Sequence, residues 1–259
     1  MIVRDVITVD GPDARGYLHS QLSNDVASLA VGSSLYSFLL EPSGKLSALV
    51  RVRCIAADRF VLDVDEGCGG SALARLNKFK IRVKCEFESS TREVVALRRL
   101  DTAARESALA LQGAVAAWRV TDGAVDVFGA ESTLLEGDVD IDSYHAERVR
   151  CRWPIFGVDI DSDTIPAETS LVDVCVSFTK GCYPGQELVE RMDSRGSTAP
   201  RLLMRLPARS PGGSFMAVAG RRYELNGTDV GLCTSVAGEY ALVMVARAHL
   251  GEVHALGYS

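Results

Sequence analysis

Helical and strand-like patterns are interleaved along the first 200 residues, and this mixture restricts the fold more than any other feature. Residues 46–56 alternate between two faces, which predicts a strand, and residues 60–64 predict a second. After Gly69-Gly70, residues 71–80 carry large apolar side chains at helical spacing, and residues 81–87 alternate again. This irregular order, with several hairpin-length gaps, predicts an α+β protein and not a regular βαβ array.

The two ends of the chain are predicted to differ. Near the start, Asp13 is expected to cap a helix that ends near Ser23-Asn24. Beyond residue 200 the pattern changes to short apolar runs between turns, at 202–206, 215–218, 230–233 and 240–245. Pro207–Gly213 is expected to be one of the turns. The sequence therefore predicts an α+β region over residues 1–200 and a small β-barrel over residues 201–259.

Composition excludes several classes of protein. A chain of 259 residues with 47% hydrophobic and 24% charged residues is an ordinary globular protein with room for two or three domains. Its net charge of −6 argues against nucleic acid as a direct partner, because phosphate binding needs a basic face. No apolar run is long enough to span a membrane, and the start has no signal-peptide pattern. We therefore expect a soluble cytoplasmic protein without a membrane partner.

The cysteines and histidines show no metal-ligand spacing. The seven cysteines form no Cys-x-x-Cys pair, and an odd number of them favours reduced thiols in a cytosol. The four histidines are scattered, and His249 and His254 are expected at the surface. The sequence predicts no metal of its own.

Residues 180–188 read Lys-Gly-Cys-Tyr-Pro-Gly-Gln-Glu-Leu and form the most distinctive segment. Pro184 is predicted at the first position of a helix, where its missing N–H costs nothing. Cys182 would then lie just ahead of a helix N-terminus, a place that favours a thiolate. Lys180, two residues away, would favour the thiolate further.

Two glycines of this segment, Gly181 and Gly185, indicate left-handed backbone or the close approach of another group. The opposing interpretation of Cys182 is structural, because cysteine is usually a small buried hydrophobe. The local pattern leaves both interpretations open.

The segment resembles the Lys-Gly-Cys-Tyr-x-Gly-Gln-Glu signature of the YgfZ family, folate-binding proteins related to the T-protein of glycine cleavage. The similarity is weak between residues 85 and 145 but covers most of the chain. Its further matches are residues 11–14, 17–26, Gly32, 41–45, 152–160 and 165–168, then Arg195-Gly196 and Arg201-Leu202.

The resemblance implies two intertwined ferredoxin-like α+β domains and a C-terminal barrel around a central folate cavity. It implies a non-covalent tetrahydrofolate ligand and an accessory role in assembling or repairing iron–sulfur clusters. The partners would then be iron–sulfur client enzymes, such as those that modify tRNA, or assembly proteins. Cys182 would be the functional thiol, able to exchange with or shield a partner's sulfur or cluster. One cysteine is too few to hold a cluster stably, so the chain is not itself expected to be an iron–sulfur protein.

The resemblance also implies a set of site residues. Lys180 is expected to act with Cys182. The candidate cofactor-binding residues are Gln21, Asn24, Asp25, Glu168, Tyr183, Gln186, Glu187 and Arg191, the last four of which also shape the cysteine loop. Asn24-Asp25 is equally typical of helix caps and turns, and Glu168 could instead pair with Arg152 or Arg191.

Two departures separate the chain from T-proteins. Their acidic pair, which includes the aspartate needed for aminomethyl transfer, is replaced by Ser47-Ala48, and no acid in that strand replaces it. A T-protein glutamate appears as Arg150. Both differences favour a YgfZ-type protein. Two alternatives stay open: a folate-dependent one-carbon transferase or demethylase that uses an acid elsewhere, and a thiol-based regulatory protein with a vestigial folate cavity.

A cluster of basic residues stands out in this acidic chain. It comprises Arg51, Arg53, Arg75, Lys78, Lys80, Arg82 and Lys84. Such residues are usually the solvated faces of a strand and a helix. They could instead form a rim that attracts the glutamate tail of a folate.

Overall fold

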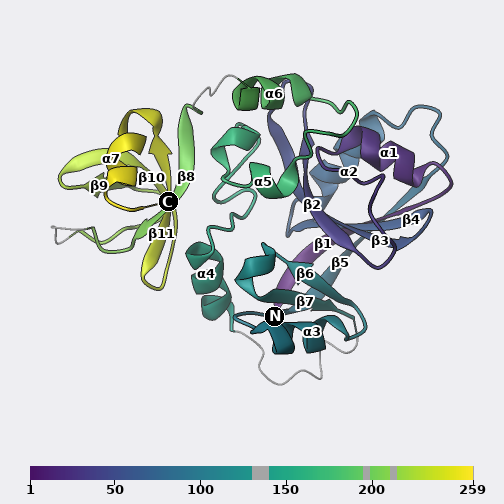
Figure 1. Cartoon of the computed structure of the whole chain (residues 1–259), viewed down its shortest axis with the longest axis horizontal. Helices are drawn as coiled ribbons and strands as arrows, with labels where there is room; N and C mark the ends of the chain where they lie inside the picture. Colours follow the sequence, from purple (N-terminus) through teal and green to yellow (C-terminus); the bar gives the residue numbers. More distant parts are fainter. Residues whose placement is uncertain (130–139, 195–198, 211–214, 259) are drawn as a thin grey trace.

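The computed structural model describes residues 1–129, 140–194, 199–210 and 215–258, so the matched Arg195-Gly196 and part of the turn predicted at Pro207–Gly213 lie outside it. The described strands form two antiparallel sheets. In Figure 1 the smaller sheet lies on the left and the larger one on the right, with α4 and α5 between them. The predicted α+β class is confirmed.

The larger sheet has seven strands in the order β2-β3-β4-β1-β5-β7-β6. Its strands are β1 (Ile2–Asp10), β2 (Ser34–Leu40), β3 (Leu46–Ala56), β4 (Arg59–Asp65), β5 (Glu86–Leu97), β6 (Ala114–Ala117) and β7 (Ala124–Phe128). The predicted strands at 46–56 and 60–64 are confirmed as β3 and β4. β1 was not predicted, yet it lies in the middle of the sheet between β4 and β5.

The two faces of the larger sheet differ in chemistry. On one face Ala48, Val50 and Val52 of β3 pack with helices α1 (Ala14–Gln21) and α2 (Gly69–Lys78) in an apolar core. On the other face the same strand carries Arg51, which is fully buried. The alternation predicted for this strand is therefore confirmed, and its polar face is enclosed by protein.

The smaller sheet has the order β8-β11-β10-β9. Its strands are β8 (Arg201–Pro207), β9 (Arg222–Leu225), β10 (Thr228–Ala237) and β11 (Tyr240–Ala246). The remaining helices described are α3 (Thr102–Leu109), η1 (Val120–Asp122), α4 (Ile141–Arg150), η3 (Pro166–Glu168), α5 (Val172–Cys175), α6 (Gln186–Ser194), η4 (Arg247–His249) and α7 (Leu250–Ala255). The second sheet begins at Arg201, and the domain boundary at that point stays a prediction.

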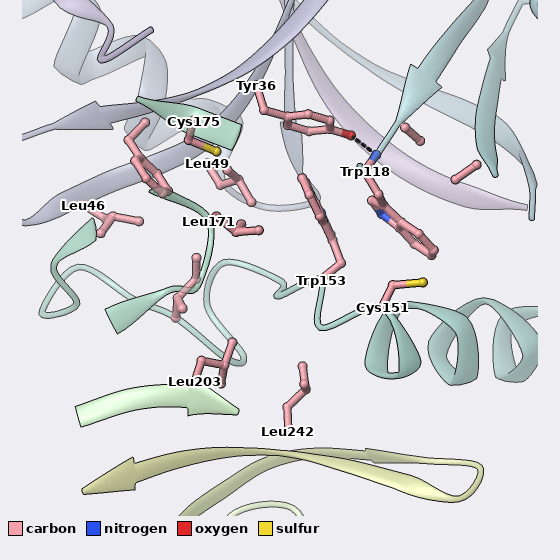
Figure 2. Close-up of a cluster of buried hydrophobic side chains, with 14 of the residues drawn as sticks. Tyr36, Leu46, Leu49, Trp118, Cys151, Trp153, Leu171, Cys175, Leu203 and Leu242 are labelled. Atoms are coloured by element: carbon pink, nitrogen blue, oxygen red, sulfur yellow. Dashed lines mark hydrogen bonds between the residues drawn. The ribbon is translucent and has the colours of Figure 1, made fainter. Parts of the chain in front are cut away.

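A second apolar core joins the two sheets. Figure 2 shows Tyr36 and Leu49 from the larger sheet meeting Trp153, while Leu203 and Leu242 approach from the smaller sheet. All five side chains are buried. The connection between the sheets is therefore an apolar interior, which holds the elements around the candidate site in fixed positions.

Three local predictions were wrong. The strand predicted at residues 81–87 begins only at Glu86, because Arg82 adopts a left-handed conformation (φ +57°) that interrupts an extended chain. Asp13 stands before α1, but its carboxylate accepts from the Lys84 N–H (2.8 Å) and not from the helix. Residues 215–218 contribute one isolated bridge and not a strand, whereas β9 was missed.

Candidate functional site

Lys180 ties the signature loop, residues 180–188, to the C-terminal end of α1. Its ammonium donates to the carbonyl oxygens of His19 and Leu22 and lies 4.9 Å from the centre of the Tyr183 ring. Burial lowers the pKa of Lys180 to about 8. Cations commonly bind the unpaired carbonyls at helix ends, so these contacts fix the loop in place. An effect of Lys180 on the thiol stays a prediction.

A β-turn precedes α6. The Gln186 N–H donates to the Tyr183 carbonyl oxygen (3.3 Å), and Gly185 between them has φ +84°. Proline followed by a left-handed glycine is typical of a type II turn. Pro184 therefore lies in the turn, and the prediction that it begins the helix is wrong, because α6 starts at Gln186.

The loop packs tightly against the turn between β2 and β3. A Cβ on Gly185 would lie 2.7 Å from the Glu41 carbonyl oxygen, and one on Gly44 (φ +86°) would lie 2.7 Å from Leu188. The close approach predicted for Gly185 is confirmed. For Gly181 the prediction is wrong, since a Cβ there meets open space and its φ is not left-handed.

Gln186 fixes the chain around the thiol. Its side-chain oxygen accepts from the Tyr183 N–H (2.9 Å), and its amide nitrogen lies 3.6 Å from the Cys182 sulfur as a donor. Cys182 is exposed and is a free thiol. The other six free cysteines are buried: Cys54, Cys68, Cys85, Cys151, Cys175 and Cys233. The fold thus presents one thiol to solvent on a loop with fixed anchors.

Asn24 uses its amide to join three segments. The nitrogen donates to the carbonyl oxygens of Tyr36 (2.8 Å) and Val174 (3.0 Å), and the oxygen accepts from the Asp25 N–H (2.8 Å). Asp25 accepts from the Ser28 N–H (3.2 Å), and hydrogen bonds to Ser28 lower the pKa of this carboxyl group. The turn interpretation of these two residues is thus confirmed, and their ligand-binding role stays a prediction.

Gln21 and Glu168 are buried and hydrogen-bonded. The Gln21 side-chain oxygen accepts from Arg75 (3.3 Å). The Glu168 carboxylate accepts from Arg201 (3.0 Å) and from the Ile165 N–H (3.1 Å). Its ionic partner is Arg201, and not Arg152 or Arg191 as the sequence suggested.

The two charged candidates on α6 point to solvent. Arg191 pairs with Glu187 at 2.6 Å, and the two side chains are 50% and 87% exposed. Their contact with a ligand stays a prediction.

An aromatic cavity of about 380 Å³ lies beside Asn24. Its lining includes Tyr36, Trp118, Arg119, Asp173 and Val174. The Tyr36 hydroxyl accepts a hydrogen bond from the backbone N–H of Trp118 (3.1 Å). Flat rings, a carboxylate and a guanidinium suit a planar polar ligand. Neither Trp118 nor Asp173 was predicted from the sequence, because Trp118 lies where the resemblance is weak and Asp173 follows no motif.

A second cavity of about 550 Å³ holds a carboxylate that the sequence reading missed. Glu41, Ser47, Arg75 and Lys78 help to line it. The Ser47 hydroxyl donates to Glu41 Oε1 (2.6 Å), and Arg75 lies 3.4 Å from the same oxygen. The strand has no acid here, as predicted, but the preceding turn places one against it.

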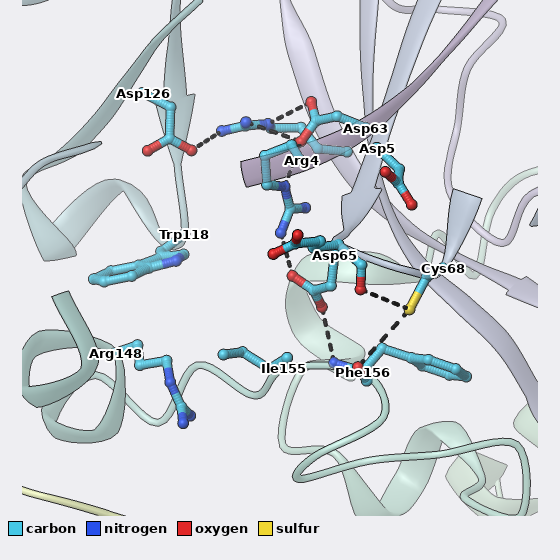
Figure 3. Close-up of polar contacts among 12 residues, drawn as sticks. Arg4, Asp5, Asp63, Asp65, Cys68, Trp118, Asp126, Arg148, Ile155 and Phe156 are labelled. Atoms are coloured by element: carbon cyan, nitrogen blue, oxygen red, sulfur yellow. Dashed lines mark hydrogen bonds and ion pairs between the residues drawn. The ribbon is translucent and has the colours of Figure 1, made fainter. Parts of the chain in front are cut away.

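A buried ion-pair network, here called the Asp63 network, occupies the inner face of the larger sheet (Figure 3). Arg51 donates to both Asp63 oxygens (3.0 Å each) and to Asp126 (2.8 Å). Arg4 joins Asp63 (3.2 Å) to Asp65. Burial opposes ionisation of Asp126, but Arg98 and Arg51 prevail and lower its pKa to about 2. Arg51 and Asp63 are fully enclosed, whereas Arg4 and Asp65 at the edge of the network also line a cavity.

Two residues of the basic cluster between residues 51 and 84 are buried. Arg51 is fully buried, and Arg75 is buried against the Leu40 carbonyl oxygen (3.0 Å). Arg51 therefore belongs neither to a solvated face nor to an open rim, whereas Arg75 also lines the second cavity, so an anion-attracting role stays a prediction for Arg75. Lys78 lines the second cavity, so an anion-attracting role stays a prediction for that residue.

No protein-family model matches the chain. The mitochondrial iron–sulfur cluster assembly factor IBA57 homolog of Neurospora crassa is 28% identical over 225 residues, covering 77% of this chain and 51% of that relative. The tRNA-modifying protein YgfZ of Cronobacter sakazakii is 26% identical over 218 residues, covering 73% of this chain and 65% of that protein. The crystal structure of glycine cleavage system aminomethyltransferase T from Bartonella henselae matches with a TM-score of 0.77 at 21% identity, covering 95% and 76% of the two chains.

The chain is similar in sequence to proteins named YgfZ and IBA57 and shares the fold of the glycine cleavage aminomethyltransferase T. The fold class implied by the resemblance is thereby confirmed. The chain spans about half to two thirds of the length of these two curated relatives.

Two further observations concern the part of the chain that the structure describes. No group of three or more His, Cys, Asp or Glu side chains there is arranged to hold a metal ion. None of its described helices is both long and apolar enough to cross a bilayer.

Proposed function

We propose that this protein is a folate-dependent accessory factor for the assembly or repair of iron–sulfur clusters, in which Cys182 is the working thiol. The observation that carries the proposal is the single exposed thiol on a loop anchored by Lys180 and Gln186. Relatives named as an iron–sulfur cluster assembly factor and a tRNA-modifying protein support this choice of process.

The chemistry of the loop suits contact with a partner's sulfur or cluster. Cys182 has access to solvent, and the Gln186 amide can donate to a thiolate at this position. Four thiolates usually hold a cluster, so one thiol can add a ligand to a partner's cluster or exchange with a partner's sulfur but cannot retain a cluster alone. Client enzymes or assembly proteins are therefore the proposed partners.

The aromatic cavity fits the ring of a folate. Its volume of about 380 Å³ lies within the range of small-ligand sites, about 300–1,000 Å³. Tyr36 and Trp118 would hold the ring, and the Asp173 carboxylate would accept hydrogen bonds from its amino edge. Asn24 braces this wall through Tyr36 and Val174. When bound, tetrahydrofolate would supply a reduced pterin able to carry one-carbon units.

Calorimetry tests the ligand. Tetrahydrofolate should bind with micromolar affinity, and Asp173→Asn should weaken binding about tenfold because a charged hydrogen bond contributes about 1.5–3 kcal/mol. Asp25→Ala tests the site predicted from sequence in the same way. Asp193→Asn, an exposed change on α6, is the control. Unchanged affinity in Asp173→Asn would remove the aromatic cavity as the pterin site, and unchanged affinity in Asp25→Ala would remove Asp25.

Complementation tests the thiol. In cells that lack the protein, Cys182→Ser should fail to restore the activity of cluster-containing enzymes. Cys68→Ala, a change at a buried cysteine, should restore it. Full rescue by a folded Cys182→Ser protein would show that the signature shapes the loop and that its sulfur is not needed.

The Glu41 carboxylate favours a second candidate, a folate-dependent one-carbon transferase. It lies against Ser47 in the larger cavity and could orient a substrate amine. Formation of methylene-tetrahydrofolate from tetrahydrofolate and an aminomethyl thioether, with release of ammonia and the free thiol, would support this activity if Glu41→Gln abolished it. Failure to bind any folate, with Cys182 still required, would instead leave the thiol-based regulatory role.

A further inference from the structure

Three arginines converge between the two sheets, and we call them the arginine cluster: Arg119, Arg152 and Arg205. Arg119 donates to the Cys151 carbonyl oxygen (3.2 Å), and Arg205 donates to the carbonyl oxygen of Arg150. These carbonyls belong to the two residues just before Arg152. Two guanidinium groups are therefore fastened to the backbone that presents the third.

The third guanidinium is carried by the residue that ends α4 in a Schellman motif, in which the Arg152 N–H donates to the Val149 carbonyl oxygen (3.1 Å) and the Trp153 N–H to that of Arg148 (2.7 Å). Arg152 has φ +54°, in the left-handed region that non-glycine residues seldom adopt. Ser170, whose carbonyl oxygen accepts from Arg119 at 2.6 Å, is also left-handed (φ +60°). The helix cap and the contacts of Arg119 therefore fix the backbone on both sides of the arginine cluster.

Arg152 has no ion pair or side-chain hydrogen bond among the described residues, although it is partly buried. Burial lowers the pKa of this guanidinium, and the like charges of Arg119 and Arg205 lower it further. Asp173 and Asp122 act in the opposite direction without pairing with it. Partly buried cations are normally paired, so the cluster has excess positive charge that an anion would offset.

The cluster also adjoins the aromatic cavity, because Arg119 and Asp173 line that cavity. A small acid could place an apolar or aromatic part against Trp118 and its anionic group on the arginines. Arginine forks suit the oxygens of carboxylate and phosphate groups equally well.

We propose that Arg119, Arg152 and Arg205 form a binding site for an oxyanion, the carboxylate or phosphate group of a small acid. The site is defined by its own residues and does not require that folate be the ligand of the cavity. A polyglutamate tail and a phosphate ester share this chemistry, and the arms of the experiment separate them.

Thermal unfolding of the full chain tests the site with inorganic phosphate, glutarate and sodium chloride at matched ionic strength. Phosphate or glutarate, at about five times its Kd, should raise the Tm by about 2–4 °C beyond the chloride value. The acid that gives the larger rise identifies the preferred group. A larger rise with folate pentaglutamate than with monoglutamate would assign the site to the glutamate tail.

Arg152→Asn should abolish this rise and leave the protein at least as stable in low salt, because it removes like-charge repulsion and asparagine tolerates left-handed backbone. Arg152→Lys should retain part of the rise. Arg82→Asn is the matched control, since Arg82 is an exposed arginine with φ +57°. Equal rises in wild type and Arg152→Asn, or no rise above chloride in wild type, would overturn the proposal. If the wild-type protein binds no folate but phosphate still raises its Tm, the result would count against the folate proposal alone.

Discussion

The Asp63 network and the signature loop are both built from polar side chains, but they use them in opposite ways. The network encloses Arg51 and Asp63 completely and satisfies them with each other. In the loop, Lys180 and Gln186 form hydrogen bonds with backbone groups that anchor the chain, and Cys182 is exposed. The buried charges of the network thus stabilise the fold, whereas the group available for chemistry, the Cys182 thiol, is exposed to solvent.

Asp63→Ala should have the largest effect. It would leave Arg51 and Arg4 buried without their shared carboxylate, and breaking a buried pair costs about 3–5 kcal/mol of unfolding free energy. Urea denaturation measures the loss, and Asp63→Asn serves if the alanine variant does not fold. Asp163→Ala, whose side chain is 78% exposed in its pair with Lys45, should change stability by less than about 1 kcal/mol. Similar losses of unfolding free energy in Asp63→Ala and Asp163→Ala would show that enclosed charge does not stabilise the fold more than exposed charge.

The second-largest effect on stability is expected from acid, which should weaken the Asp63 network. The pKa of Asp126 is about 2 in the folded protein and 3.8 without the fold, so the unfolded chain binds the extra proton between these values. Stability is thus present above pH 4 and lost as pH falls toward 2, by about 2 kcal/mol from this group. Denaturation curves across this range should lose that component in Asp126→Asn. A variant with the same pH slope as wild type would contradict the assignment.

The two glycines of the loop give an internal test of its packing. Gly185→Ala should cost about 1–2 kcal/mol, because alanine is strained at φ +84° and its Cβ would meet the Glu41 carbonyl oxygen. Gly181→Ala, in open space, should cost less than about 1 kcal/mol. Chemical denaturation compares the two. Equal costs would mean that contact with the β2–β3 turn does not hold the loop.

Cys182→Ser should have the smallest effect on stability, within about 0.5 kcal/mol, because the side chain is exposed. A thiol probe should label one cysteine of the native wild-type protein quickly and none in this variant, while the six buried thiols react only on unfolding. Fast native labelling of a second cysteine would remove the contrast between enclosed and available groups.

The sequence predicted elements whose pattern is local. β3 was found with its bounds because apolar residues recur at every second position from Ala48 to Cys54, and the close approach of Gly185 followed from glycine's lack of a Cβ. β1 escaped prediction although it is central, and the strand at residues 81–87 failed at a left-handed Arg82. A period-2 pattern reports which way side chains point but not where a single backbone angle breaks the strand.

By itself, the sequence determined the α+β class and the signature around Cys182, since both are written in short-range patterns. Folding encloses Arg51, brings Glu41 against Ser47, and places Arg119 of the arginine cluster in the wall of the aromatic cavity. Arg51 meets Asp126 across 75 positions of the chain, and Asn24 meets Val174 across 150. Charge and polarity can be read from each residue, but the partner that satisfies a buried group comes from distant chain segments brought together by folding.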